Sequence, residues 1–310
     1  MGLAALFQAA LALVTAPAPN PPPEPLARLT PREKAALVVV SGLPAPRGVG
    51  GVIVRRWDRD APRPPDALVF VDQEGGDVRA FPQLPPASSA SAFTSGRAAV
   101  AAGRATGRAL RDAGVHVDLA PVVDLDTGPL GSRHFQRPAL AVAFARGLEQ
   151  GGVAACPKHF PGLGSAPITT DARPRVPARV LRRELDGFRA AVDAGVDCVM
   201  TSHALYDRFR GRRGLTTRET YRLLRRLGFE GVAITDSLSV VRGRWPVRWA
   251  RRAALAGADL LLFTSPDDAR RAIRALVPLA RKGLLDEHVR RVRDLRRSWA
   301  SFRPMSVWRG

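Results

Sequence analysis

The sequence predicts a single α/β domain, folded as a (β/α)8 TIM barrel over residues 29–300. Three observations predict this fold class. Eight short apolar runs alternate with longer segments of helical period, and most of these runs are continuously apolar. The chain of 310 residues also suits one barrel, a unit that typically takes about 250 residues. A hydrophobic share of 45% with 25% charged residues is sufficient for a sizeable core.

The eight strands are expected where the apolar runs lie. Runs of this kind, without a period of two, are typical of parallel strands that are covered on both faces. They span residues 36–42, 50–56, 67–76, 115–124, 153–160, 197–205, 231–238 and 258–265.

Helices are expected between most of these strands. The stretches "SGRAAVAAGRATGRALRDAG" and "VLRRELDGFRAAVDAG" are amphipathic, and each ends in Gly, which commonly follows the last turn of a helix. The connections after the first strands contain little sequence of helical period. An irregular first part of the barrel is therefore predicted.

Polar residues follow several of the predicted strands. The carboxyl ends of barrel strands share one mouth, where active sites lie. Carboxylates accept hydrogen bonds from sugar hydroxyls, and Lys or Arg donate to them, so a ring of such groups predicts a carbohydrate ligand. The residues at these ends are Asp72-Gln73-Glu74, Asp118, Asp124, Lys158-His159, Ser202-His203 and Asp236-Ser237.

Several motifs occur in the order of one known family. They are "LTPREKAALVVV", "VDQEGG", "LAPVVDLD" with "GSRHF", "KHFPGLG", "VMTSHALY", "GFEGVAITDSL" and "AGADLLLF". From about residue 29 to about residue 298 the chain resembles the single-domain bacterial β-N-acetylglucosaminidases of glycoside hydrolase family 3. The resemblance implies a retaining hydrolase of terminal β-linked N-acetylhexosamine or β-hexose, with no cofactor, and a role in cell-wall glycan turnover.

The resemblance also implies which residues bind the sugar. Asp72 would accept hydrogen bonds from the far hydroxyl of the non-reducing sugar. Arg133, Lys158 and His159 would bind other hydroxyls of the same ring, and His203 would line the same pocket.

The resemblance implies that Asp236, at the end of "GVAITD", is the carboxylate nucleophile. A retaining glycosidase needs such a carboxylate to form a glycosyl-enzyme and a second group to protonate the leaving oxygen. The family uses a histidine as this second group, in a loop that closes on Asp-Ser-His. Here Leu163 replaces an earlier histidine of that loop, and the closing triplet reads Asp171-Ala172-Arg173. Arginine cannot release a proton near neutrality, because its pKa exceeds ~12.

Three interpretations of this departure stay open. Asp171 could act as the acid if loop closure removes water and raises its pKa, although an Asx-turn is the alternative role for it. His134 could lie near the leaving group instead. The third interpretation is a catalytically silent member that binds glycans without cleaving them. A phosphorylase, in which phosphate accepts the sugar, is a variant of the enzyme hypothesis.

The formal net charge of +20 raises nucleic acid as a partner. Lysine occurs only at positions 34, 158 and 282, and the arginines are scattered over helix-like segments without any nucleic-acid-binding motif. We therefore expect no nucleic-acid partner, and attraction to anionic surfaces such as an acidic cell wall.

The ends of the chain differ from its middle. Residues 1–28 combine an apolar run with a Pro-rich linker, which resembles a signal peptide but is too short for comfortable membrane spanning. Residues 301–310 form a short tail. An exported monomer without stable membrane insertion is predicted, with a cytoplasmic location left open.

Two cysteines, Cys156 and Cys198, lie in strand-like runs. Buried free thiols are the expected state, and a disulfide is the alternative because the two runs could be neighbours in a barrel. The sequence has no spacing typical of a metal site.

Overall fold

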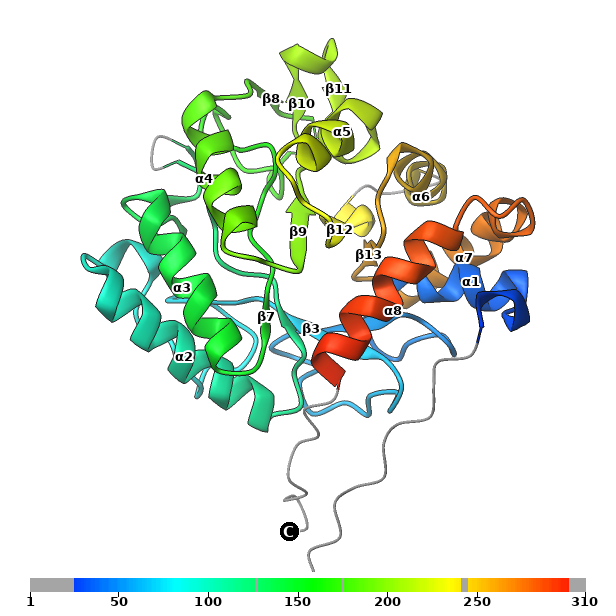
Figure 1. Cartoon of the computed structure of the whole chain (residues 1–310), viewed down its shortest axis with the longest axis horizontal. Helices are drawn as coiled ribbons and strands as arrows, with labels where there is room; N and C mark the ends of the chain where they lie inside the picture. The colour runs from blue at the N-terminus through cyan, green and yellow to red at the C-terminus, as the bar shows by residue number, and fades with distance from the viewer. Residues whose placement is uncertain (1–24, 126–127, 174, 241–244, 301–310) are drawn as a thin grey trace, which may run out of the picture.

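A computed structural model describes residues 25–125, 128–173, 175–240 and 245–300. Its strands lie between peripheral helices, with α2, α3 and α4 along one side and α6, α7 and α1 along the other (Figure 1). Eight strands are parallel to their sheet neighbours and fall one by one within the eight predicted runs. They are β1 (Val39–Ser41), β2 (Gly51–Val54), β3 (Leu68–Val71), β6 (Val117–Asp118), β7 (Ala154–Ala155), β9 (Cys198–Thr201), β12 (Val232–Thr235) and β13 (Leu261–Phe263).

The eight strands form two parallel sheets. Six pair in the order β13-β1-β2-β3-β6-β7, and β12 pairs with β9. Isolated parallel bridges join Phe160 to Thr201 and Ile234 to Leu260, between the ends of the two sheets. The prediction of an α/β fold with parallel strands is therefore confirmed.

The remaining strands are short and belong to the loops. The hairpin of β4 (Gln73–Gly75) and β5 (Val78–Arg79) directly follows β3. A second small sheet contains β8 (Pro177–Ala178), β10 (Leu205–Tyr206) and β11 (Arg212–Arg213).

Three helices begin at side-chain caps. Thr30 and Glu33 form a capping box at the start of α1, and the Ser95 and Ser265 side chains cap α2 and α7. The α-helices are α1 (Pro31–Leu37), α2 (Gly96–Asp112), α3 (Pro138–Gln150), α4 (Arg182–Asp193), α5 (Arg218–Arg226), α6 (Trp245–Ala256), α7 (Pro266–Arg281) and α8 (Asp286–Ala300). The 3₁₀ turns are η1 (Leu26–Arg28), η2 (Ala90–Ala92), η3 (Gly131–Arg133), η4 (Asp207–Phe209), η5 (Gly214–Thr216) and η6 (Leu238–Val240).

The predicted irregular start is confirmed. The chain is described continuously from β1 to β3, and neither of the two connections in this part contains a helix. Both consist of turns and irregular backbone.

Strand side chains alternate between two apolar clusters. Val39, Val52 and Val69 belong to a large cluster that also contains residues of α1 to α7. The intervening side chains form a second cluster, the inner core, which residues of α8 complete. Its members are Val40, Ile53, Leu68, Phe70, Val117, Leu119, Ala154, Cys156, Cys198, Met200, Val232, Ile234, Leu260, Leu262, Val292 and Leu295. Both faces of the strands are thus buried, which explains the continuously apolar runs.

The expectation of free thiols is wrong. Cys156 and Cys198 form a disulfide inside the inner core, with their Cα atoms 4.5 Å apart. Cys156 follows β7, and the chain beyond it runs alongside β9, which begins at Cys198. The two residues lie 42 positions apart in sequence, so only the tertiary pairing of these segments reveals that they are neighbours.

Most of the predicted leader, and all of the predicted tail at 301–310, lies outside the described residues. Of the segment 1–28, only residues 25–28 are described, and they contain η1. No helix in the described part of the chain has the length and apolar character needed to cross a membrane.

Candidate active site

Asp72 and Glu74 reach the site through the turn that follows β3. Asp72 comes directly after the strand, and Glu74 lies in β4 of the hairpin. Gly75 closes this turn with a φ of +104°, a conformation that side chains other than glycine rarely adopt. A Cβ atom at Gly75 would also lie 2.3 Å from the carbonyl oxygen of Ser88. The "EGG" sequence therefore allows the hairpin to fold back and direct Glu74 inward.

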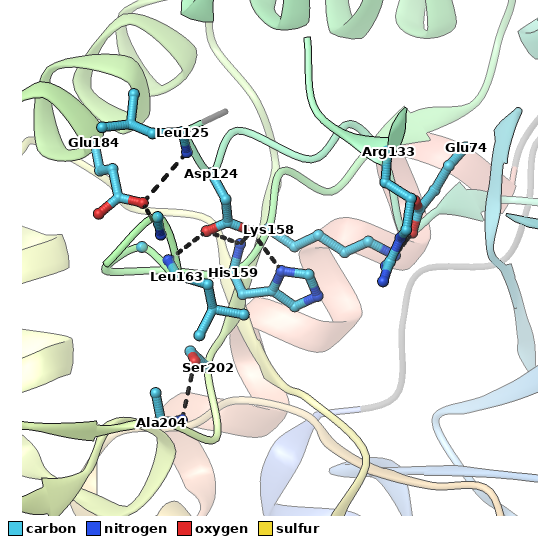
Figure 2. Close-up of polar contacts among 12 residues, drawn as sticks. Glu74, Asp124, Leu125, Arg133, Lys158, His159, Leu163, Glu184, Ser202 and Ala204 are labelled. Carbon is cyan, nitrogen blue, oxygen red and sulfur yellow. Dashed lines mark hydrogen bonds and ion pairs between the residues drawn. The ribbon is translucent and has the colours of Figure 1, made fainter. Parts of the chain in front are cut away.

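Asp72, Glu74, Arg133 and Lys158 form what we call the ion-pair cluster. Lys158 Nζ lies 2.6 Å from Asp72 Oδ1 and 2.6 Å from Glu74 Oε1. Arg133 donates from Nε and Nη2 to the two oxygens of Glu74, both at 2.8 Å. Figure 2 shows the Lys158 side chain extended toward Arg133 and Glu74. Only Asp72, with 42% of its side chain exposed, and Arg133, with 23%, have substantial access to a ligand.

The charges of this cluster stabilise one another. Burial alone would raise the pKa of Glu74, but the nearby charges of Lys158 and Arg133 outweigh it and lower that pKa to about 2. Burial would likewise lower the pKa of Lys158, yet Asp72 and Glu74 raise it. Lys158 and Glu74 are therefore both ionised at neutral pH.

Asp118 lies fully buried next to the cluster. Its Oδ1 accepts a hydrogen bond from the Gln73 amide at 2.9 Å, and its Oδ2 has no partner among the described residues. Burial raises the pKa of Asp118 to about 8, and the charges of Asp72 and Glu74 act in the same direction, against Lys158 and the amide. Asp118 is thus expected to be neutral at pH 7.

His159 follows Lys158 in the chain but points elsewhere. Its Nδ1 lies 2.7 Å from Oδ2 of Asp124, a buried carboxylate that also accepts hydrogen bonds from the amides of His159 and Leu163 (Figure 2). A proton on Nδ1 satisfies this contact and leaves Nε2 as the ring atom that can meet a ligand. Asp124 therefore orients His159 and holds the start of the next loop.

That loop, residues 162–173, rests on Glu184 of α4. Glu184 Oε1 accepts hydrogen bonds from the amides of Gly164 at 2.6 Å and Leu125 at 3.4 Å (Figure 2). A Cβ atom at Gly162, whose φ is +126°, would lie 2.3 Å from the Glu184 carboxyl group. Burial, followed by the like charge of Asp124, raises the pKa of Glu184 to about 8 despite these two amides.

Asp236 follows β12 and is partly exposed. Its Oδ1 accepts a hydrogen bond from the Ser237 amide at 2.7 Å. His203 is fully buried, and its Nε2 lies 2.6 Å from the Ser237 carbonyl oxygen. Because a carbonyl oxygen only accepts hydrogen bonds, Nε2 carries a proton. Burial lowers the pKa of His203, so the ring is neutral and supports the backbone beside Asp236.

Asp171 is exposed at the far end of the 162–173 loop. The side chain that caps this turn is that of Thr169, whose hydroxyl accepts a hydrogen bond from the Ala172 amide at 3.2 Å. Among the described residues, the Asp171 carboxylate has no hydrogen-bond partner. Its charge nevertheless acts to raise the pKa of both His203 and Arg133, after the larger effects of burial and nearer groups. Asp171 therefore lies close enough to His203 and Arg133 for its charge to act on both.

The structure joins the predicted residues in two groups. Asp72 and Lys158 are in direct contact, and Glu74 connects them to Arg133. His203 and Asp236 are connected through Ser237. Within the described residues, the His159 side chain makes its hydrogen bond with Asp124 and none with the ion-pair cluster. His134, the other residue considered as a proton donor, has a buried Nδ1 without a partner among the described residues.

Sequence reasoning did not assign roles to Glu74, Asp124 and Glu184. Glu74 and Asp124 were visible as carboxylates near strand ends, but nothing in the chain showed which groups each would contact. Glu184 gave no signal, because it lies in an ordinary amphipathic helix. Within the described residues, no group of three or more His, Cys, Asp or Glu side chains is arranged to hold a metal ion.

The chain is similar to known proteins in sequence and in fold. The family model described as Glycosyl hydrolase family 3 N terminal domain matches residues 53–295. A beta-hexosaminidase of Methylococcus capsulatus is 34% identical over 237 residues, covering 67% of this chain and 70% of the relative.

Two solved structures are similar. One is a glycoside hydrolase family 3 beta-N-acetylglucosaminidase from Paenibacillus sp., with a TM-score of 0.80 and 27% identity over 91% of this chain and 65% of that chain. The other is a beta-N-acetylhexosaminidase from Beutenbergia cavernae, with a TM-score of 0.76 and 26% identity over 86% of this chain and 98% of that chain. The chain thus spans less than two thirds of the Paenibacillus protein but nearly all of the Beutenbergia protein.

Proposed function

The chain belongs to glycosyl hydrolase family 3, and from this premise we propose that it is a retaining hydrolase of terminal β-linked N-acetylhexosamine, or β-hexose, residues. The predicted family and the predicted enzyme class, a glycoside hydrolase, are confirmed. The names of the relatives, beta-hexosaminidase and beta-N-acetylglucosaminidase, support N-acetylhexosamine as the sugar.

We further infer that the two sheets close into one (β/α)8 barrel. The order β13-β1-β2-β3-β6-β7 continues to β9 and β12 if the isolated bridges are counted as strand pairing. The bridge at Phe160 then joins β7 to β9, and the bridge at Ile234 joins β12 to β13. Alternating side chains and a separate inner core support this arrangement. In such a barrel the ion-pair cluster and Asp236 share one mouth.

The ion-pair cluster is the observation that supports sugar binding best. Glu74 occupies the buried side of Lys158, so the partly exposed Asp72 and Arg133 are left to exchange hydrogen bonds with hydroxyls. An ionised, fully paired cluster does not have to reorganise when a neutral sugar binds. Charge-assisted hydrogen bonds to hydroxyls would then orient the ring relative to Asp236.

In the proposed mechanism Asp236 attacks the anomeric carbon and forms the glycosyl-enzyme. The Ser237 amide and the neutral His203 hold this part of the backbone. Asp171 gives its proton to the leaving oxygen and later accepts a proton from the water that releases the sugar. Its exposed position requires the 162–173 loop to move inward on substrate binding, which would bring the carboxyl group to the leaving oxygen and exclude water from it.

A silent glycan-binding protein is the second candidate function. The observation that favours it lies in the 162–173 loop, where Leu163 is buried and Arg173 is exposed at positions where the family carries histidines. The ion-pair cluster would still bind a sugar in such a protein, but no group would protonate the leaving oxygen.

Hydrolysis of 4-nitrophenyl β-N-acetylglucosaminide and of the matching β-glucoside tests the proposal. We expect turnover of the first substrate by the wild type and loss of at least about 10³-fold in kcat for Asp236→Asn, because the nucleophile is removed. Asp267→Asn, the same change at a largely exposed carboxylate of α7, should retain activity. No turnover of any aryl glycoside by the wild type would support the silent binder, whereas equal activity of the wild type and Asp236→Asn would rule out Asp236 as the nucleophile.

We also propose a location, an oligomeric state and a natural substrate for this activity. An exported monomer that acts on cell-wall glycans fits the strongly basic composition and the paired cysteines, because disulfides persist mainly in oxidising compartments.

A further inference from the structure

Trp57 is unusually exposed for a tryptophan. Its relative exposure is 76%, whereas the other exposed large hydrophobic residues in the described part of the chain, Ile168, Leu255 and Leu284, reach 37–48%. A tryptophan side chain normally buries most of its apolar surface, so leaving it in water costs free energy. Single exposed apolar residues are common, and the position and support of the ring must therefore decide whether it has a role.

The backbone under Trp57 is tightly held. Arg55 and Asp58 close a turn in which the Asp58 amide donates to the Arg55 carbonyl oxygen at 3.0 Å. The Asp58 carboxylate accepts hydrogen bonds from the Arg55 amide and, at 2.8 and 2.6 Å, from its guanidinium Nε and Nη2. Trp57 is thus an exposed residue on a fixed turn.

The ring itself is supported from one side. The guanidinium carbon of Arg55 lies 4.9 Å from the centroid of the Trp57 ring, within the range of a cation–π contact. The same guanidinium donates to the carbonyl oxygen of Thr264 at 3.0 Å. Arg55 therefore orients the ring, and the high exposure of Trp57 leaves much of the remaining ring surface to solvent.

This turn lies at the edge of the candidate site. Val54 of β2 pairs with Val71 of β3, so Arg55 and Asp72 follow neighbouring strand ends. On the other side, Thr264 Oγ1 lies 3.3 Å from Ser237 Oγ, in the residue after Asp236. Arg55, which supports the Trp57 ring, is thus next to the strand end that carries Asp72. Through Thr264 it is also linked to the residue that follows Asp236.

We propose that Trp57 is a stacking platform for a second sugar ring of a glycan chain, next to the ring bound by the ion-pair cluster. The C–H face of a pyranose is apolar, and a rigid indole provides a matching flat surface at little cost in side-chain entropy. The short, helix-free connection between β2 and β3 leaves this turn at the surface. The inference deepens the proposed function, because it names oligosaccharides rather than single glycosides as the preferred ligands.

Isothermal titration calorimetry separates this inference from the question of catalysis. The protein carries Asp236→Asn to prevent hydrolysis, and the ligands are N-acetylglucosamine and its β-1,4-linked tetrasaccharide. We expect the tetrasaccharide to bind more tightly, and Trp57→Ala to reduce this advantage by about tenfold, the loss of one aromatic contact of about 1.4 kcal/mol. Trp57→Phe should retain most of the advantage. Leu284→Ala, which removes an exposed apolar side chain between α7 and α8, should retain all of it.

Each result decides something. An unchanged advantage in Trp57→Ala, or no advantage in the parent protein, overturns the inference while leaving the proposed hydrolase intact. No binding of either saccharide overturns the inference and also the assignment of N-acetylhexosamine as the sugar. Binding of the tetrasaccharide that depends on Trp57, in a wild-type chain that hydrolyses nothing, supports the platform and overturns the hydrolase. Circular dichroism checks that the exposed substitutions leave the fold unchanged.

Discussion

Two buried glutamates support the two halves of the candidate site in opposite ways. Glu74, in the ion-pair cluster, contacts Lys158 and Arg133, and their charges lower its pKa to about 2. Glu184, under the 162–173 loop, contacts two backbone amides, and burial raises its pKa to about 8. The first is ionised at neutral pH and the second is mostly protonated.

The difference shows where this protein is preorganised. A buried carboxylate with two cations is held in one geometry, so the half that we propose to bind the sugar is complete before a ligand arrives. A buried carboxyl group without a cation gives up its charge, and the loop above it is held by a few neutral contacts. We infer that the sugar-binding half is rigid and that the proton-donating half depends on loop movement.

The largest effect is expected at the loop. Asp171→Ala should reduce the hydrolysis of substrates with poor leaving groups by about 10²–10⁴-fold, because only these require protonation, and should affect activated aryl glycosides far less. Steady-state kinetics on a series of aryl leaving groups measures this difference, and azide should partly rescue the variant by attacking the glycosyl-enzyme. Asp77→Ala, at another exposed carboxylate, is the matched control. An equal loss on all leaving groups would show that Asp171 has a structural role.

A large effect on stability is expected in the ion-pair cluster. Glu74→Gln leaves Lys158 and Arg133 without their shared carboxylate, which should lower the free energy of unfolding by about 3–5 kcal/mol. Urea denaturation measures the change, and Glu287→Gln, at an exposed ion pair of α8, should cost at most about 1 kcal/mol.

The lowered pKa of Glu74 also predicts a loss of folding stability at acid pH. The pKa of Glu74 is lower in the folded chain, so its stabilisation is present above pH 4.5 and is lost as the pH falls toward 2. Glu74→Gln should remove this part of the pH dependence. A loss no larger than that of Glu287→Gln would contradict the assigned role of the cluster.

The smallest effect, a change in the pH dependence of folding stability, is expected at Glu184. Its pKa is higher in the folded chain, so the native state binds more protons and loses stability as the pH rises from 4.5 through 8. Glu184→Gln is always neutral and keeps a carbonyl oxygen for the amides of Leu125 and Gly164. At pH 8 it should be more stable than the wild type by on the order of 1 kcal/mol. Thermal denaturation across this range tests the sign, and lower stability of the variant at pH 8 would refute a protonated Glu184.

The sequence by itself determined the strands, the family and the residue types at the strand ends. Both faces of each strand are buried, so the apolar runs are continuous and identify all eight strands. Motifs such as "VDQEGG" and "KHFPGLG" are local, and they therefore indicated Asp72 and Lys158 without any knowledge of packing. The roles assigned to Asp171 and Asp236 stay predictions.

Only the tertiary structure decided which distant groups meet. Glu74 and Arg133 are 59 positions apart, and so are Leu125 and Glu184, yet each pair is joined by hydrogen bonds. The same applies to the disulfide between Cys156 and Cys198. Whether a buried carboxyl group keeps its charge depends on the cations that surround it in space. Sequence spacing contains no such information, because the neighbours come from other strands and helices.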